Sequence, residues 1–169
     1  MKFPEKNEKY ISRDEYLSMS DSELLKNCEI SMLRRTGKGG QKVNKCSSSV
    51  RLKHIPTKIT VISSESRYQA ENRSIALKKL RRQIAFQLRA PTGDFKINFP
   101  IPSLKNPNYP QWIAKILDVL EENSYSVSDA AAKLAISTGQ LIKLLSRDPE
   151  LCQKVNIERK KFFMKPLNF

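Results

Sequence analysis

Residues 33–45 read Leu-Arg-Arg-Thr-Gly-Lys-Gly-Gly-Gln-Lys-Val-Asn-Lys, the most informative stretch of the chain. The chain has 5 glycines in 169 residues, and three of them, Gly37, Gly39 and Gly40, lie within this stretch. Glycine is favoured where the backbone must take a positive φ, or must approach another molecule with no Cβ in the way. An isolated Gly-Gly-Gln is most often a solvated turn, so the flanking sequence has to decide between a turn and a functional loop.

The flanking sequence is strongly basic. The whole chain has a formal net charge of +14, and residues 31–90 alone carry 15 Lys and Arg against 2 Asp and Glu, a net charge of +13. Charge concentrated in this way is typical of a surface that binds nucleic acid. The alternative, a solvated basic face without a partner, fits this density less well.

The composition excludes several other classes of protein. Three separated cysteines form no CxxC pair, which argues against a disulfide framework and a zinc site and favours a reducing compartment. A single histidine, His54, leaves little material for histidine-dependent catalysis or metal binding. No apolar run is long enough to cross a membrane, and the N-terminus lacks the apolar segment of a secretory signal. We therefore expect a cytoplasmic protein with no metal and no cofactor.

The first half of the chain predicts a small mixed domain. Ser20 and Glu23 form a capping-box pattern that predicts a short helix ending near Asn27. Alternation of apolar and polar residues predicts strands over 28–33 and 49–55, and a returning strand over 58–63 after a turn at residues 56–58. Residues 66–88 predict the longest helix, whose core-facing stripe is formed by Leu77, Leu80, Ile84 and Leu88. Its other faces are basic, Arg81 among them.

The second half is proline-rich and then helical. Five of the nine prolines fall between residues 90 and 110, which predicts an extended linker lying against the first domain. Residues 111–169 predict helices throughout, with a helix-turn-helix pattern over 128–145 in which Ser137 caps the second helix and Ala135 stands where glycine is usual. Asp148-Pro149 predicts the start of another helix. The basic and aromatic residues 159–165 are compatible with either a nucleic-acid contact or a frayed terminus.

These motifs together carry a family resemblance. Residues 28–88 resemble the catalytic domain of class I peptide chain release factors and of their shorter relatives that rescue stalled ribosomes. The matching segments are Gly37-x-Gly39-Gly40-Gln41-x-Val43-Asn44-Lys45, Val50-Arg51-Leu52-x-His54-Ile55-Pro56-Thr57, Glu65-Ser66-Arg67 and Asn72-Arg73. Lys38, Cys46 and Lys58 depart from the residues usual in the family, but Gly39, Gly40 and Gln41 are intact.

The resemblance implies a peptidyl-tRNA hydrolase that acts only on the ribosome. Water would attack the ester joining the nascent peptide to tRNA in the peptidyl-transferase centre, and the backbone N–H of Gln41 would stabilise the developing oxyanion. The Gln41 side chain would admit water and exclude larger nucleophiles, and Gly39 and Gly40 would permit the backbone path. The residues expected to dock ribosomal RNA and the tRNA are Arg34, Arg35, Lys38, Lys42, Lys45, Arg51, Arg67 and Arg73.

The expected fold is α+β: an arm and short helix over 1–27, a catalytic domain over 28–90, a linker over 91–110 and a helical module over 111–169. A full-length release factor is about twice this length and carries a codon-reading domain. We therefore expect codon-independent hydrolysis by a monomer, with the ribosome and peptidyl-tRNA as partners and a glutamine methyltransferase acting on Gln41 as a further candidate partner. The familiar rescue factors end in a long basic tail, whereas residues 91–169 carry a net charge of only +3.

Two alternatives belong to other functional classes. The helix-turn-helix pattern is compatible with a regulator that binds nucleic acid, but residues 138–145 offer only Gln140 and Lys143 to base edges. A protein with this domain could also bind the ribosome without hydrolysis, although that role gives no chemical reason to keep Gly39-Gly40-Gln41.

Overall fold

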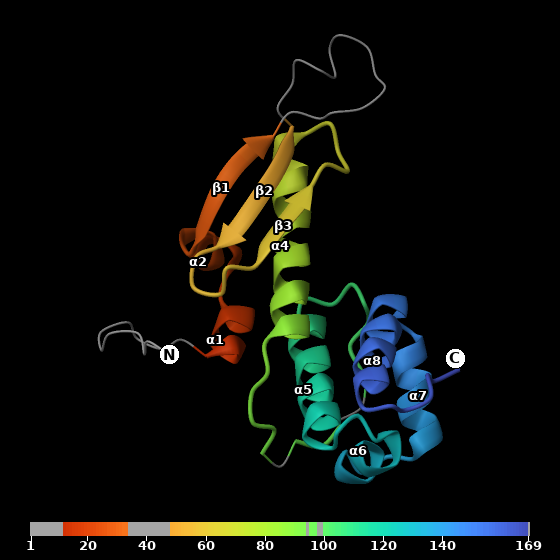
Figure 1. Ribbon diagram of the computed structural model, residues 1–169. Helices are drawn as coiled ribbons and strands as arrows, with labels where there is room; N and C mark the ends of the chain where they lie inside the picture. The colour runs from red at the N-terminus through yellow and green to blue at the C-terminus, as the bar shows by residue number, and fades with distance from the viewer. Residues whose placement is uncertain (1–11, 34–47, 94, 98–99, 169) are drawn as a thin grey trace, which may run out of the picture. The chain divides into compact units, whose positions relative to one another are not determined.

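A computed structural model describes residues 12–33, 48–93, 95–97 and 100–168. The chain divides into two compact units, Met1–Ile84 and Ala85–Phe169, which are described separately below. The first unit combines helices with a small β-sheet and the second is helical (Figure 1).

The sheet of the first unit has three antiparallel strands in the order β1-β2-β3. Strands β1 (Cys28–Leu33), β2 (Ser49–His54) and β3 (Thr60–Ser63) match the predicted strands closely. The pairing runs from Cys28 opposite His54 to Leu33 opposite Ser49, so β1 and β2 are in register over their full lengths. The turn between β2 and β3 includes Lys58 at a φ of 61°, within the segment predicted to reverse the chain.

One face of the sheet packs into the core. Val50, Leu52 and His54 alternate along β2 and are fully buried, which confirms the period of two seen in the sequence. Helix α4 (Gln69–Gln87) runs along this sheet in Figure 1. Its side chains at positions 77, 80 and 84 are buried, as predicted, whereas Leu88 lies just past the last helical residue and is half-buried. The core is thus formed by alternate residues of β2 and by residues spaced three or four apart on α4.

Two short helices precede the sheet. Helix α1 (Arg13–Ser18) and helix α2 (Asp21–Lys26) both have a serine at the N-cap, and Ser20 and Glu23 form the predicted capping box. Arg81 of α4 donates hydrogen bonds to the carbonyl oxygens of Leu17 (3.1 Å) and Met19 (2.7 Å) and to Asp21 Oδ1 (2.9 Å). Arg81, which the sequence analysis placed among the basic residues of this helix, therefore has a structural role: its guanidinium bonds the end of α1 and ties it to α4.

The second unit contains helices α5 (Tyr109–Glu122), α6 (Val127–Lys133), α7 (Thr138–Ser146) and α8 (Pro149–Lys161). The segment before α5 also belongs to this unit. The backbone N–H of Ala90 donates to Asp118 Oδ1 (3.2 Å), that of Thr92 to Glu122 Oε1 (2.9 Å), and that of Ile97 to the Leu134 carbonyl oxygen (3.5 Å). We predicted that this segment lies against the first domain, but these bonds join it to the helical unit. The core of the unit is formed by Ile113, Ile116, Leu117, Leu120, Leu134, Leu141, Leu145 and Leu151.

Local signals in the sequence set the helix ends of this unit. Ser137 and Gln140 form a capping box at the start of α7, and Asp148 caps α8 ahead of Pro149. Ala135 takes a φ of 57° in the turn between α6 and α7, which explains why glycine is usual at such a position. The prediction of a mixed fold with a small sheet is confirmed. The linker and the helix-turn-helix assignment stay predictions.

Candidate functional site

The glycine-rich loop connects two paired strands. The loop residues named above, which comprise Gly39, Gly40, Gln41, Arg34, Arg35, Lys38, Lys42 and Lys45, lie outside the described residues. Both ends of the connection are described, however, because Leu33 closes β1 and its cross-strand partner Ser49 opens β2. The sheet therefore brings Leu33 and Ser49, the paired residues on either side of this segment, next to each other.

Asn72 anchors the end of this connection to the rest of the unit. Its side chain is fully buried on α4, and its amide nitrogen donates to the carbonyl oxygens of Ser48 and Ser66, both at 2.7 Å. Its amide oxygen accepts from the Ser66 backbone N–H at 2.9 Å and from the Ser63 hydroxyl at 3.4 Å. One side chain thus joins the residue before β2, the end of β3 and the segment before α4.

Two of the predicted RNA-binding residues flank this anchor. Arg67 follows Ser66, and Arg73 follows Asn72 and is exposed on α4. The Arg67 guanidinium lies 4.8 Å from the ring centroid of Tyr68 and donates to its hydroxyl at 2.7 Å. Tyr68 is 52% exposed, so arginine and ring together present a flat cationic surface. The sequence analysis did not identify Tyr68, although an aromatic residue directly after an arginine in a basic segment was a usable signal.

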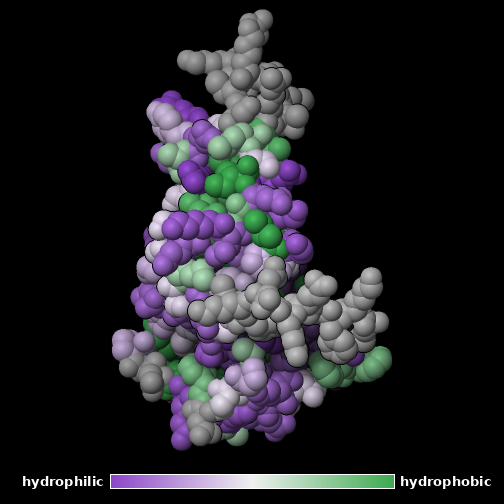
Figure 2. Space-filling model, turned by 90° about the vertical axis from the view of Figure 1, so that its left-hand side faces the viewer, coloured by the Kyte–Doolittle hydropathy of each residue, from purple (hydrophilic) through white to green (hydrophobic). Residues whose placement is uncertain are grey.

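Arg51 occupies a different surface. Because Val50 and Leu52 face the core, Arg51 points to the opposite, solvent-exposed face of the sheet, where it donates to Ser31 Oγ at 3.3 Å. Lys53, next along that face, pairs with Glu29 at 3.1 Å. The three described arginines of the predicted set therefore lie on β2, on the β3–α4 connection and on α4. Figure 2 views the protein from the β1 side of Figure 1. In the upper part of that picture, patches of hydrophobic surface lie among hydrophilic residues.

Two ionisable side chains of the first unit, His54 and Cys28, are suited to structure rather than to chemistry. His54 is fully buried, its Nδ1 lies 2.8 Å from Thr57 Oγ1, and its ring meets Tyr16 edge-on at 4.6 Å. Burial lowers the pKa of His54, so the imidazole is neutral at neutral pH. Burial also raises the pKa of the Cys28 thiol to about 11, which keeps it protonated. Neither side chain is therefore an activated acid or nucleophile.

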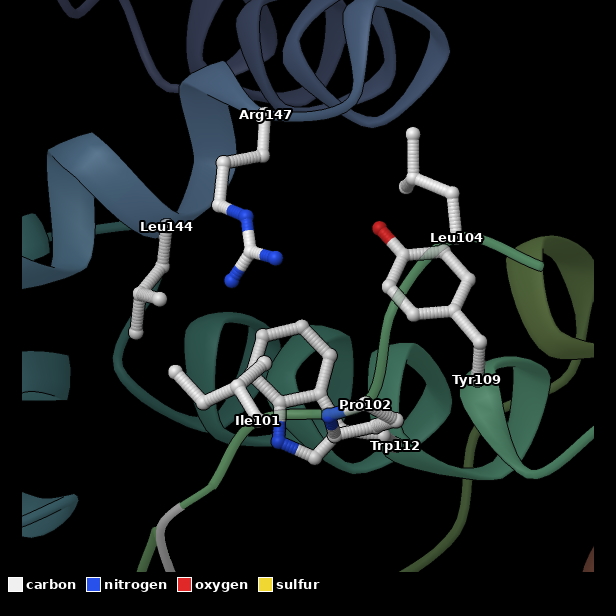
Figure 3. A pocket seen from close by; sticks show the side chains of 7 residues that line it. All are labelled: Ile101, Pro102, Leu104, Tyr109, Trp112, Leu144 and Arg147. Atoms are coloured by element: carbon white, nitrogen blue, oxygen red, sulfur yellow. The ribbon is translucent and has the colours of Figure 1, made fainter. Parts of the chain in front are cut away.

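The second unit presents few side chains that could hydrogen-bond to the edges of nucleic-acid bases. Gln140 Oε1 accepts a hydrogen bond from the Ser137 backbone N–H at 2.9 Å, so half of its amide serves the helix cap instead of a base edge. A shallow hollow in this unit is lined by Ile101, Pro102, Leu104, Tyr109, Trp112, Leu144 and Arg147 (Figure 3). The Tyr109 and Trp112 rings stack at 5.9 Å, and the Tyr109 hydroxyl donates to the buried Asp148 at 2.8 Å. That bond holds the Tyr109 ring within the unit. We interpret the hollow as the packing boundary between the proline-rich segment and helices α5 and α7.

Comparison with known proteins defines the class of the first unit. Residues 21–93 match the model of the RF-1 domain family, a span that begins at α2 and ends after α4. The match covers 73 of the 169 residues, and over this span the chain contains a domain similar to those of the RF-1 domain family.

The relatives found by sequence carry matching names. The chain is 44% identical over 75 residues to the putative mitochondrial peptide chain release factor 1 of Schizosaccharomyces pombe, and 48% identical over 61 residues to peptide chain release factor 1 of Acidiphilium cryptum. It is 51% identical over 49 residues to an uncharacterized mitochondrial release factor-like protein of Saccharomyces cerevisiae. These matches cover 44%, 36% and 29% of this chain and 18%, 17% and 32% of the relatives, so the chain spans only a fraction of their length.

Proposed function

We propose that this protein releases the nascent peptide on the ribosome without reading a stop codon, by hydrolysing the peptidyl-tRNA ester. One observation carries the proposal: the loop bearing Gly39-Gly40-Gln41 connects the paired strands β1 and β2 inside an RF-1 domain. The match of residues 21–93 to the RF-1 domain family supports a release-factor-like function. Independence from the codon, the monomeric state and the methylation of Gln41 by a partner enzyme are parts of the proposal.

Hydrolysis of the ester requires a hydrogen-bond donor from the protein rather than a nucleophile, because water is the nucleophile. Water attacks the ester carbonyl, and the Gln41 backbone N–H donates to the oxygen on which negative charge develops. The neutral, buried His54 and the protonated Cys28 take no part in this step. Arg67 and Arg73, close to the side chain of Asn72 that bonds the Ser48 carbonyl oxygen, supply positive charge for RNA phosphates.

The compartment is also part of the proposal. We favour the cytoplasm, while two of the relatives named above are mitochondrial proteins. Within the described residues, the helices are all too short or too polar to span a lipid bilayer.

A release assay tests the proposal directly. Ribosomes stalled on truncated mRNA and ribosomes paused at a stop codon, both carrying labelled peptidyl-tRNA, are treated with the full chain. We expect release from both, and loss of release in Gly40→Ala and Gln41→Ala. Gly139→Ala and Gln153→Ala are matched controls, because a Cβ at Gly139 meets no atom within 4 Å and Gln153 is exposed on α8. Release that persists in both loop variants would refute the hydrolytic mechanism, and release only at a stop codon would refute codon independence.

A further inference from the structure

The end of helix α8 presents an aromatic ring to solvent. Phe163 is 99% exposed, whereas Phe162 beside it is 45% exposed and lies against Tyr125 with ring centroids 5.9 Å apart. The contact with Tyr125 gives the Phe162 ring a packing role. Phe163 has no comparable explanation within its own unit.

The segment that carries Phe163 is held in place. The Asn156 side chain on α8 donates to the Leu167 carbonyl oxygen at 3.2 Å and accepts from the Leu167 N–H at 2.8 Å. Arg159 donates to the Lys165 carbonyl oxygen through Nε (3.1 Å) and Nη2 (3.0 Å), and to the Tyr125 carbonyl oxygen through Nη1 (2.5 Å). Of the two readings of residues 159–165, these contacts favour a built surface over a frayed terminus.

Phe163 also stands at a backbone position that favours glycine. Its N–H donates to the Lys160 carbonyl oxygen (3.1 Å) and the Met164 N–H donates to that of Arg159 (3.0 Å), the two bonds of a Schellman motif. Phe163 takes the left-handed φ of 56° that this motif requires, where a Cβ crowds the backbone. An exposed phenylalanine here therefore costs stability and returns none through burial. Such a combination points to a role toward another molecule.

The charges around Phe163 indicate the chemistry of that molecule. Residues 159–165 contain four cations and no acid. Arg159 serves the backbone, and Lys161 pairs with Glu158 at 2.7 Å. Lys160 and Lys165 are exposed. Lys160 also complements the α8 dipole, but Lys165 lies beyond the helix and has no such role. The surface therefore combines a fully exposed ring, on a backbone held by hydrogen bonds, with cations close by in the sequence.

We propose that Phe163, Lys160 and Lys165 form an RNA-binding surface on which an unpaired base stacks on the ring while the lysines contact the flanking phosphates. Base stacking on aromatic side chains with adjacent cations is the usual mode for unpaired nucleic acid. A membrane would require a broader apolar face than Phe163 and the partly exposed Phe162 provide, and an acidic peptide would leave the Phe163 ring unexplained. The inference extends the proposed function, because it gives the helical unit an RNA contact separate from the loop of the RF-1 domain.

RNA binding by the full chain tests this surface. The probe is a short 3′-fluorescein-labelled oligouridylate, followed by anisotropy over a range of salt concentrations. Phe163→Gly should weaken binding about tenfold, equivalent to about 1.4 kcal/mol. Its thermal unfolding temperature should not fall, because glycine suits the backbone at 163. Lys165→Gln should reduce the slope of log affinity against log salt by about 0.7. Phe163→Trp should retain binding, and Ala135→Gly, the same backbone change in another turn, should leave it unaltered.

Crosslinking separates this surface from the basic RF-1 domain. An oligouridylate containing 5-iodouridine should crosslink to the peptide bearing Phe163, and Phe163→Gly should remove that crosslink. Unchanged affinity in Phe163→Gly, or crosslinks confined to residues 12–84, would overturn the proposal. The proposal would also be overturned if Phe163→Gly lost binding to polyglutamate or to phosphatidylglycerol vesicles but kept its affinity for oligouridylate. Gln41→Ala should lose peptide release yet keep the Phe163 crosslink. Release that survives in Gln41→Ala would therefore refute the proposed function without refuting this RNA-binding surface.

Discussion

Replacing Asn72 should loosen the loop of the RF-1 domain from its support. The Asn72 side chain makes four hydrogen bonds, two as donor to the Ser48 and Ser66 carbonyl oxygens and two as acceptor from Ser66 and Ser63. Asn72→Ala removes all four in a fully buried place. The three backbone groups of Ser48 and Ser66 lose their partner, and each such loss costs about 1 kcal/mol. The expected loss in the free energy of unfolding is about 3 kcal/mol.

Asn72→Asp separates the donor bonds from the acceptor bonds. The carboxylate still accepts from the Ser66 N–H but has no hydrogen to donate to Ser48 and Ser66, and it places negative charge beside two carbonyl oxygens. We expect a loss of at least about 2 kcal/mol at neutral pH. Asn108→Ala is the matched control, because Asn108 is exposed and makes no side-chain capping bond at the start of α5.

Urea unfolding measures the stability, and the release assay measures the consequence for the loop. If the bond to Ser48 positions the loop, release at saturating protein should fall in both Asn72 variants by more than their unfolded fraction explains. A loss in unfolding free energy well below about 1 kcal/mol in Asn72→Ala would refute the reasoning about buried hydrogen bonds. Normal release by fully folded Asn72→Ala would refute the positioning role.

Further predictions concern the turn between α6 and α7 and two of the titrating groups whose pKa values are lowered, His54 and Glu122. Ala135→Gly should raise the free energy of unfolding by about 0.5 kcal/mol in thermal melts, because Ala135 holds a φ of 57°, and Ala135→Val should lower it. His54 keeps a neutral ring in the fold, so stability should be intact above its ordinary pKa of 6.5 and fall as the pH drops toward the lower folded value; His54→Gln should abolish this slope in urea titrations. Hydrogen bonds from Lys133 and Thr92 lower the pKa of Glu122 to about 2, so its contribution should persist down to acidic pH, and NMR titration of its carboxyl in Thr92→Val should show a higher pKa.

Local patterns predicted most of the fold. The capping box at Ser20, the alternation along β2 and the proline after Asp148 act over a few residues, and all three appear where the sequence placed them. Contacts between distant segments were missed. Arg81 looks like an exposed helix cation in sequence, but its partners in Leu17 and Met19 lie more than 60 positions away. Nothing in the pattern around Arg81 distinguishes it from its neighbours.

The candidate site shows the same division. The glycine loop and its basic flanks were evident from composition alone, because glycine and charge requirements are local. Asn72 stood out only as part of a motif, and its role depends on the Ser48 carbonyl oxygen 24 residues earlier in the chain. Phe163 could not have been recognised as a built surface, since its meaning rests on a positive φ and on the bonds from Asn156 and Arg159.

The boundary between the units also decides how the helical part is best tested. Removing the helices from residue 107 onward is the simplest design, but the contacts of the second unit begin earlier. Ala85 and Phe86 are buried, and Arg89 pairs with Glu121 of α5 at 2.7 Å. A truncated chain would leave Arg89 without that partner and the N–H groups of Ala90 and Thr92 without their acceptors on α5, so a loss of release would not by itself show that α5–α8 contact RNA. Point variants such as Phe163→Gly and Lys165→Gln keep these contacts, and loss of release in them identifies a contribution of the helical unit to ribosome binding.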